Sequence, residues 1–162
     1  MVEISTSLLS VDKNEIIKTI YNLEIAKTDY FHIDVMDGVF VENNTVEKML
    51  EYCDYLTSVT NIPIDVHLMV KDVKKYIDLF LAYNPNIITI HYESFNNLEE
   101  LENMITYINQ NNCKVGISIK PNNDSISVII SIVPFSLLVK KFITIIIMNI
   151  FNIILAVFIL SK

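Results

Sequence analysis

The spacing of hydrophobic positions alternates between two periods along the first 124 residues. Apolar residues at every second position, or in short continuous runs, favour strands, whereas apolar residues three or four positions apart favour helices. Strands are predicted at residues 2–5, 31–36, 63–69, 87–91 and 114–119. The helical stripes between them are Ile16, Ile17, Ile20 and Leu23; Met49, Leu50 and Cys53; Val73, Ile77, Phe80 and Leu81; and Leu98, Leu101, Ile105 and Ile108. This alternation predicts an α/β fold with about five βα units around a parallel sheet.

Two polar signals refine the predicted boundaries. Asp12 is a plausible N-cap for the first helix, because its carboxylate can accept a hydrogen bond from the unpaired backbone N–H groups of the first turn. Asp37 and Gly38 directly follow the strand at 31–36 and predict a turn there.

Ionisable residues occupy one face of each of the strands at 31–36 and 63–69. With a period of two, the mixed faces hold His32, Asp34 and Met36 in one strand and Asp65, His67 and Met69 in the other. In a βα barrel such a face points inward, and active sites are built at the carboxyl ends of the strands. Two imidazoles and a carboxylate from adjacent strands can bind a divalent metal. Hydrogen-bonded core residues are the alternative, and the spacing leaves both interpretations open.

Composition excludes some classes of function. The chain has 162 residues, is 52% hydrophobic, and carries 12 basic residues, all lysine, against 19 acidic ones. A net charge of -7 argues against nucleic-acid binding, which needs a basic face to neutralise phosphates. Cys53 and Cys113 lack metal-site spacing and are expected to be reduced structural thiols. The acidic start resembles no signal peptide, so we expect a cytoplasmic protein.

The composition changes sharply after residue 125. Residues 126–162 contain three lysines and no acid, and both glycines, Gly38 and Gly116, lie before them. Residues 142–160 are uncharged and long enough to span a bilayer as a helix, with Lys140 and Lys141 retaining the N-terminal part in the cytosol. Three explanations stay open: a membrane anchor, a segment that covers an open sheet edge, or the product of a frameshift or premature stop.

Five segments in order resemble the ribulose-phosphate 3-epimerase family. They are STSLLSVD (5–12), FHIDVMDGVFVEN (31–43), DVHLMV (65–70), ITIH (88–91) and GISIKP (116–121). The resemblance covers roughly the first 125 residues. It implies a TIM-type (β/α) barrel, here truncated to about five βα units and followed by a hydrophobic C-terminal helix.

The resemblance also implies an activity, which is the interconversion of D-ribulose 5-phosphate and D-xylulose 5-phosphate by metal-assisted proton transfer at C3 through an enediolate. By family matching, Asp34 is a catalytic acid/base carboxylate and a metal ligand. His32 and His67 would bind the metal and contact the substrate. Ser7 would hydrogen-bond the substrate, and Met36 and Met69 would line the site. The implied cofactor is a divalent cation such as zinc, manganese, iron or cobalt.

The chain departs from the family pattern after about residue 125. Glycine-rich phosphate loops and a second acid/base aspartate, which the family carries in its later strands, have no counterpart there. We therefore expect a partial barrel domain over 1–125, a divergent hydrophobic tail over 126–162 and impaired turnover. The expected partner is a small sugar phosphate, and a homo-oligomer or membrane contact through the tail stays open. The alternative function is a non-catalytic, membrane-associated or oligomer-forming remnant of an epimerase.

Overall fold

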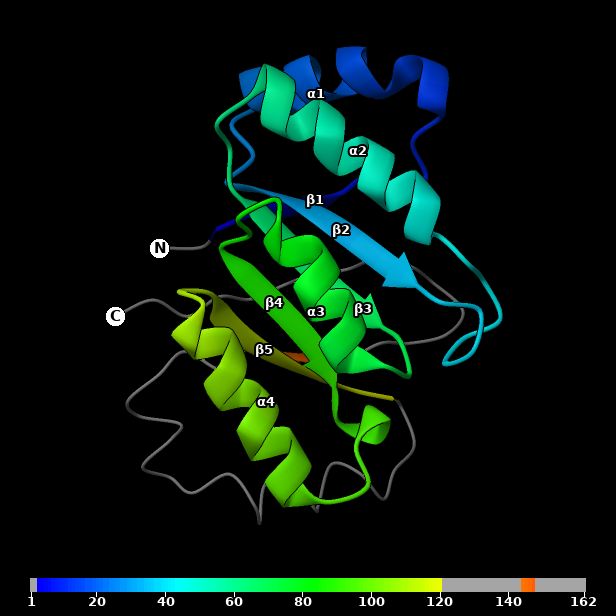
Figure 1. The fold of residues 1–162 in the computed structure, drawn as a ribbon. Helices are drawn as coiled ribbons and strands as arrows, with labels where there is room; N and C mark the ends of the chain where they lie inside the picture. The colour runs from blue at the N-terminus through cyan, green and yellow to red at the C-terminus, as the bar shows by residue number, and fades with distance from the viewer. Residues whose placement is uncertain (1–2, 121–143, 148–162) are drawn as a thin grey trace.

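In the computed structural model of the protein, residues 3–120 and 144–147 are described. These residues form strands that alternate with helices along the chain (Figure 1). The elements are β1 (Ser5–Ser7), η1 (Lys13–Glu15), α1 (Ile16–Ile25), β2 (Tyr30–Met36), α2 (Val46–Val59), β3 (Ile64–Met69), α3 (Val73–Leu81), β4 (Ile87–His91), η2 (Tyr92–Ser94), α4 (Leu98–Gln110), β5 (Lys114–Ile119) and β6 (Thr144–Ile147).

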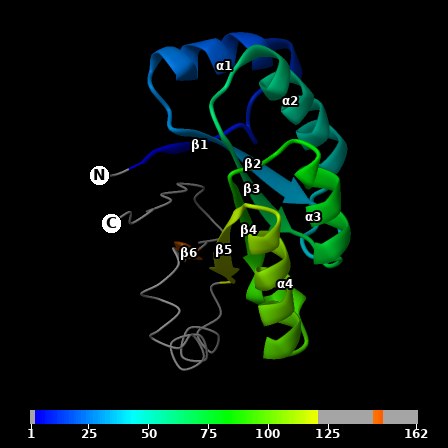
Figure 2. The same cartoon turned by 60° about the vertical axis from the view of Figure 1, so that its left-hand side comes forward.

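The described strands form one parallel sheet in the order β1-β2-β3-β4-β5-β6. Every neighbouring pair in this order is parallel, and helices connect consecutive strands from β1 to β5. The four α-helices lie on one face of the sheet, as the two views show (Figures 1 and 2). The predicted TIM-type α/β arrangement of parallel strands and helices is therefore confirmed.

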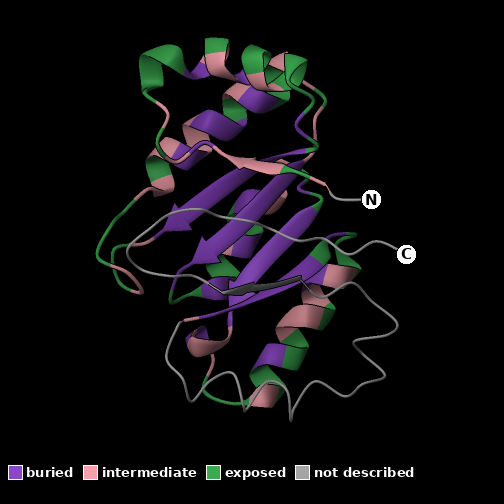
Figure 3. Cartoon of the chain, turned by 180° about the vertical axis from the view of Figure 1, so that it is seen from behind, coloured by how far each residue is buried: buried purple, intermediate pink, exposed green. Residues whose placement is uncertain are grey.

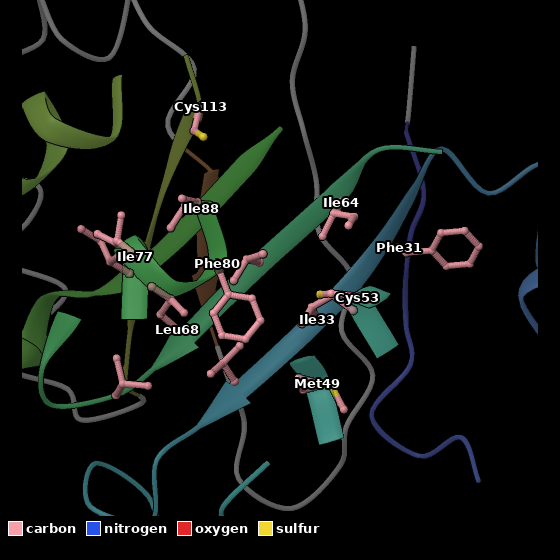
Figure 4. Packing of buried hydrophobic residues seen from close by; sticks show 14 of the residues in the cluster. Phe31, Ile33, Met49, Cys53, Ile64, Leu68, Ile77, Phe80, Ile88 and Cys113 are labelled. Carbon is pink, nitrogen blue, oxygen red and sulfur yellow. The ribbon is translucent and has the colours of Figure 1, made fainter. Parts of the chain in front are cut away.

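The hydrophobic core lies between the helices and one face of the sheet. Ile33 and Leu68 of the strands lie close to Met49 and Phe80 of the helices (Figure 4), and Phe31 belongs to the same cluster. Each of these side chains is fully buried. Burying a side chain of this size stabilises the fold by roughly 1.5–3 kcal/mol. The alternating apolar positions thus attach the sheet to the helices and turn the mixed polar face of β2 and β3 to the opposite side.

The first strand begins later than predicted. Ile4, whose apolar side chain suggested a strand at 2–5, is 59% exposed and precedes β1. Strand β1 instead contains Ser5 and Ser7, whose hydroxyl groups donate to the buried carboxylates of Asp65 on β3 and Asp34 on β2. A polar strand is stable here because its side chains are hydrogen-bonded, which apolar periodicity does not detect. The other predicted strands agree with the structure to within one residue.

Other local predictions agree with the structure. Asp12 accepts a hydrogen bond from the backbone N–H of Asn14 and is the N-cap of η1, the short helix that leads into α1. The N-cap of α1 itself is Glu15, which makes no side-chain capping bond. Gly38 has a φ of +75°, in the left-handed region that a tight turn after β2 requires. Cys53 and Cys113 are free and buried, and burial raises the pKa of the Cys53 thiol to about 12.

Seen from the side opposite to the helices, β2, β3 and β4 are buried along their whole length (Figure 3).

Within the predicted hydrophobic helix at 142–160, the structure describes only Thr144–Ile147. These residues form β6, which pairs in parallel with β5 from Gly116 to Ile119, so a strand replaces the predicted helix at these four positions. A run of β-branched residues favours a strand, and the edge of β5 offers unpaired backbone groups. The rest of that prediction lies outside the described residues. No helix among the described residues is long and apolar enough to cross a membrane.

Candidate active site

Three ionisable side chains meet on the face of the sheet opposite to the helices. His32 and Asp34 are two residues apart on β2, and the strand register places His67 of β3 beside Asp34. One carboxylate oxygen, Asp34 Oδ1, lies 3.2 Å from His32 Nε2 and 3.3 Å from His67 Nδ1. All three residues are buried. The structure therefore brings together the three residues that sequence matching assigned to metal binding.

Ser7 joins the same cluster from β1. Its hydroxyl donates to the second carboxylate oxygen of Asp34, with 2.6 Å between Ser7 Oγ and Asp34 Oδ2. The Ser7 oxygen also accepts a hydrogen bond from the backbone N–H of Leu9. Parallel pairing of β1 with β2 aligns Ser7 with His32, which explains why a polar residue at this position reaches the cluster.

The histidines hold the Asp34 side chain in its ionised form. Burial alone would raise the pKa of Asp34, but hydrogen bonds from His32 and His67, together with their positive charge, lower it well below its ordinary value. Burial would also lower the pKa of His32, yet the charges of Asp65 and Asp34 and the hydrogen bonds to both raise it to about 10. The site therefore favours a charged carboxylate beside a readily protonated imidazole.

Asp65 and His91 extend the cluster on either side, and sequence matching assigned neither of them to the site. Asp65 Oδ2 lies 2.7 Å from His32 Nδ1 and also accepts a hydrogen bond from Ser5. His91 Nε2 lies 2.9 Å from His67 Nε2. Burial lowers the pKa of His91 to about 4, despite the nearby Glu93 carboxylate. Two sequence features could have indicated these residues. Asp65 lies on the mixed face of its strand by period-two alternation, and His91 lies at the carboxyl end of β4, where barrel active sites are built.

Met36 and Met69 are neighbours at the carboxyl ends of β2 and β3. They are aligned in the strand register and both are buried, on the face that carries His32 and His67. Methionine side chains are apolar and polarizable, so the pair forms a weakly hydrated border to the ionisable cluster.

The loop after β2 folds back over this end of the sheet. Asp37 accepts hydrogen bonds from the backbone N–H groups of Val39 and Phe40, and a bridge joins Asp37 to Asn44. The Phe40 ring lies 5.0 Å from the His91 ring, centroid to centroid. The Lys120 ammonium group lies 3.6 Å from the centroid of the same Phe40 ring. Phe40 therefore contacts both His91 of β4 and Lys120, the residue that follows β5.

The donor set fits a divalent cation. His32, Asp34 and His67 each offer one ligand atom, and these atoms lie within 4.8 Å of one another. Two imidazole nitrogens and one carboxylate oxygen suit zinc, manganese, iron or cobalt. The donor chemistry thus agrees with the cofactor class expected from the sequence.

The protein has the α/β fold of a barrel-type enzyme, in which parallel strands alternate with helices. Its potential metal ligands lie near the carboxyl ends of the strands, where barrel enzymes have their active sites. The family model of the Ribulose-phosphate 3 epimerase family matches residues 3–150. The chain belongs to this family. The matched region continues past residue 125, where the motifs recognised in the sequence end.

Curated relatives carry the name ribulose-phosphate 3-epimerase. The protein from Bacillus subtilis (strain 168) is 32% identical over 122 residues, covering 75% of this chain and 54% of the relative. The Helicobacter pylori (strain J99) protein is 32% identical over 126 residues, or 78% and 55% of the two chains. The chloroplastic ribulose-5-phosphate-3-epimerase of Arabidopsis thaliana is 30% identical over 118 residues, or 73% and 41%. The chain spans about half the length of the curated relatives it matches.

Proposed function

We propose that this chain transfers the C3 proton of D-ribulose 5-phosphate, the step that begins conversion to D-xylulose 5-phosphate. The single observation that carries the proposal is the buried cluster of His32, Asp34 and His67, which lies inside the region matched to the epimerase family. Asp34 is the proposed base, and the two histidines and Asp34 are the proposed ligands of a divalent cation.

Asp34 has the properties that a base in this reaction needs. A proton next to a carbonyl is weakly acidic, so its removal requires a fixed carboxylate and a way to stabilise the developing oxyanion. Asp34 is held in one orientation by the hydrogen bond from Ser7 and by its close contacts with His32 and His67, which also favour its ionised form. A divalent cation, when bound, supplies positive charge near the oxyanion.

The surrounding side chains support binding and exclude water. The Ser7 hydroxyl, which donates to Asp34, is placed to donate to a hydroxyl or carbonyl oxygen of the sugar instead. Met36 and Met69 border the cluster with apolar surface, and Phe40 covers His91. Expelling water in this way strengthens the electrostatic interactions within the site.

Complete inversion at C3 needs a proton donor on the face opposite to the base. Among the described residues, Asp65 is the other buried carboxylate on this side of the sheet, but its Oδ2 is engaged by His32 and Ser5. We therefore propose that Asp34 exchanges the C3 proton with solvent faster than the chain completes epimerisation.

An assay of ribulose 5-phosphate conversion to xylulose 5-phosphate tests this function. The full chain, supplied in turn with zinc, manganese, ferrous iron and cobalt, is compared with the Bacillus subtilis relative. Loss of a general acid typically costs about a hundred- to ten-thousand-fold, so conversion should be slower by a factor in that range. Asp34→Asn should abolish it, and Ser118→Ala should leave it unchanged. Conversion that survives Asp34→Asn would contradict the proposal.

A further inference from the structure

We propose that Asp65 and His91 are positioning residues for the two metal-binding histidines. Each accepts a hydrogen bond from one ring nitrogen of its histidine. The other ring nitrogen, which lies beside Asp34, is then available to bind the cation. The inference rests on the proposed function, because it requires His32 and His67 to bind a divalent cation.

The two imidazole rings present different nitrogens to Asp34. His32 presents Nε2, at 3.2 Å from Asp34 Oδ1, whereas His67 presents Nδ1, at 3.3 Å from the same oxygen. A histidine that binds a metal through one nitrogen carries its proton on the other and donates it to an acceptor. Nδ1 of His32 and Nε2 of His67 therefore each need a hydrogen-bond acceptor.

Asp65 supplies the acceptor for His32. Its Oδ2 lies 2.7 Å from His32 Nδ1, and both residues are buried with at most 1% of their surface exposed. The Ser5 hydroxyl donates to the same oxygen at 2.8 Å and fixes its position. An ionised carboxylate can only accept, so it holds the proton on Nδ1 and leaves the lone pair of Nε2 for a cation.

His91 supplies the acceptor for His67. The two Nε2 atoms lie 2.9 Å apart in rings stacked at 16°, so one nitrogen carries the proton and the other accepts it.

Glu93 determines which of the two Nε2 atoms, that of His67 or that of His91, accepts the hydrogen bond. His91 Nδ1 lies 3.5 Å from Glu93 Oε2, and neither atom has a hydrogen-bond partner among the described residues. The backbone N–H of Lys120 donates to the other oxygen of Glu93. The carboxylate favours a proton on Nδ1 of His91, which makes Nε2 of His91 the acceptor. His67 then donates from Nε2 and keeps Nδ1 for the cation.

Zinc affinity of the full chain, measured by competition with a chelating dye, tests the two roles. Asp65→Ala and His91→Phe remove the acceptors, and loss of such a partner weakens metal binding by about 10- to 100-fold. Asp65→Asn and His91→Gln keep an acceptor oxygen and should restore part of the affinity. Ser118→Ala is the matched control, because Ser118 is equally buried and its hydroxyl has no hydrogen-bond partner among the described residues. The control should bind zinc as the wild type does.

Nitrogen-15 NMR of the histidine rings gives a readout that a merely structural role would not change. In the zinc-loaded wild type, we expect the proton on Nδ1 of His32 and on Nε2 of His67. Asp65→Ala should make the His32 ring proton exchange rapidly with solvent while the His67 pattern persists, and His91→Phe should do the reverse. Wild-type affinity and unchanged ring protons in all four variants would overturn this inference alone. A wild-type chain that binds no zinc, manganese or cobalt would overturn both this inference and the proposed function.

Discussion

Gly116 of β5 lies directly opposite Thr89 of β4, and the Thr89 side chain occupies the space that a Cβ at position 116 would take. A glycine is required at this position because the two strands approach each other with the threonine side chain between them. The two residues lie on the same face as His67 and His91, so their packing sets the spacing of β4 and β5 beside the ionisable cluster.

Gly116→Ala should therefore destabilise the chain. Forcing an extra methyl group into a packed site typically costs about 1–3 kcal/mol. Urea unfolding should show this loss, and Gly116→Ala combined with Thr89→Ala should recover part of it because the obstructing side chain is gone. Equal stability of Gly116→Ala and the wild type would show that the strands separate easily at this point.

Lys120 should hold the loop over the site. Its ammonium group contacts the Phe40 ring and donates to the Phe40 backbone carbonyl at 3.2 Å. We expect Lys120→Ala to raise the amide hydrogen-exchange rates of residues 38–43 several-fold, because local opening of the loop becomes easier. Lys18→Ala, which removes an exposed ion pair between Lys18 of α1 and Glu15 of η1, is the control and should not affect the loop. Equal hydrogen-exchange rates of residues 38–43 in both variants would show that Lys120 does not hold the loop.

Stability should fall as the pH decreases from about 6.5 to 4. The pKa of His91 is lowered from 6.5 to about 4 in the folded chain, so in this window the unfolded chain binds a proton that the folded chain does not. The free energy of unfolding consequently rises with pH, by up to about 3 kcal/mol across the window. Urea titrations at several pH values should show a smaller slope for His91→Gln than for the wild type. Parallel slopes would assign the pH dependence to other groups.

His67→Ala should remove most divalent-metal binding. The substitution deletes one of three ligand atoms and leaves His32 and Asp34 in place. Calorimetric titration with zinc or manganese should show the loss, whereas Ser118→Ala should bind as the wild type does. If His67→Ala binds as tightly as the wild type, the metal site lies elsewhere.

Strand periodicity together with the family resemblance identified the residues of the candidate site. The alternation in β2 and β3 put His32, Asp34 and His67 on one face, and the parallel register then makes Asp34 and His67 neighbours. Strands β4 and β5 were predicted at the residues where the structure has them, because β4 is a short, mainly apolar run and β5 has an apolar residue at every second position.

The hydrogen-bonded surroundings of the site could not be predicted in the same way. Periodicity assigns a side chain to a face, but it does not say which nitrogen of an imidazole meets which partner. The contact between His91 and Glu93 also depends on η2, a short turn without any hydrophobic period. Strand β1 begins later than predicted, because its polar side chains are stabilised by carboxylates from other strands and not by an apolar pattern.

Deuterium uptake at C3 of ribulose 5-phosphate tests the central claim most directly. The full chain is incubated with substrate and a divalent cation in deuterated water, and C3 exchange and xylulose 5-phosphate formation are followed together by NMR. We predict that wild-type exchange outpaces epimer formation and that Asp34→Asn lowers exchange by at least about a hundred-fold. Exchange that persists undiminished in Asp34→Asn would contradict the assignment of Asp34 as the base.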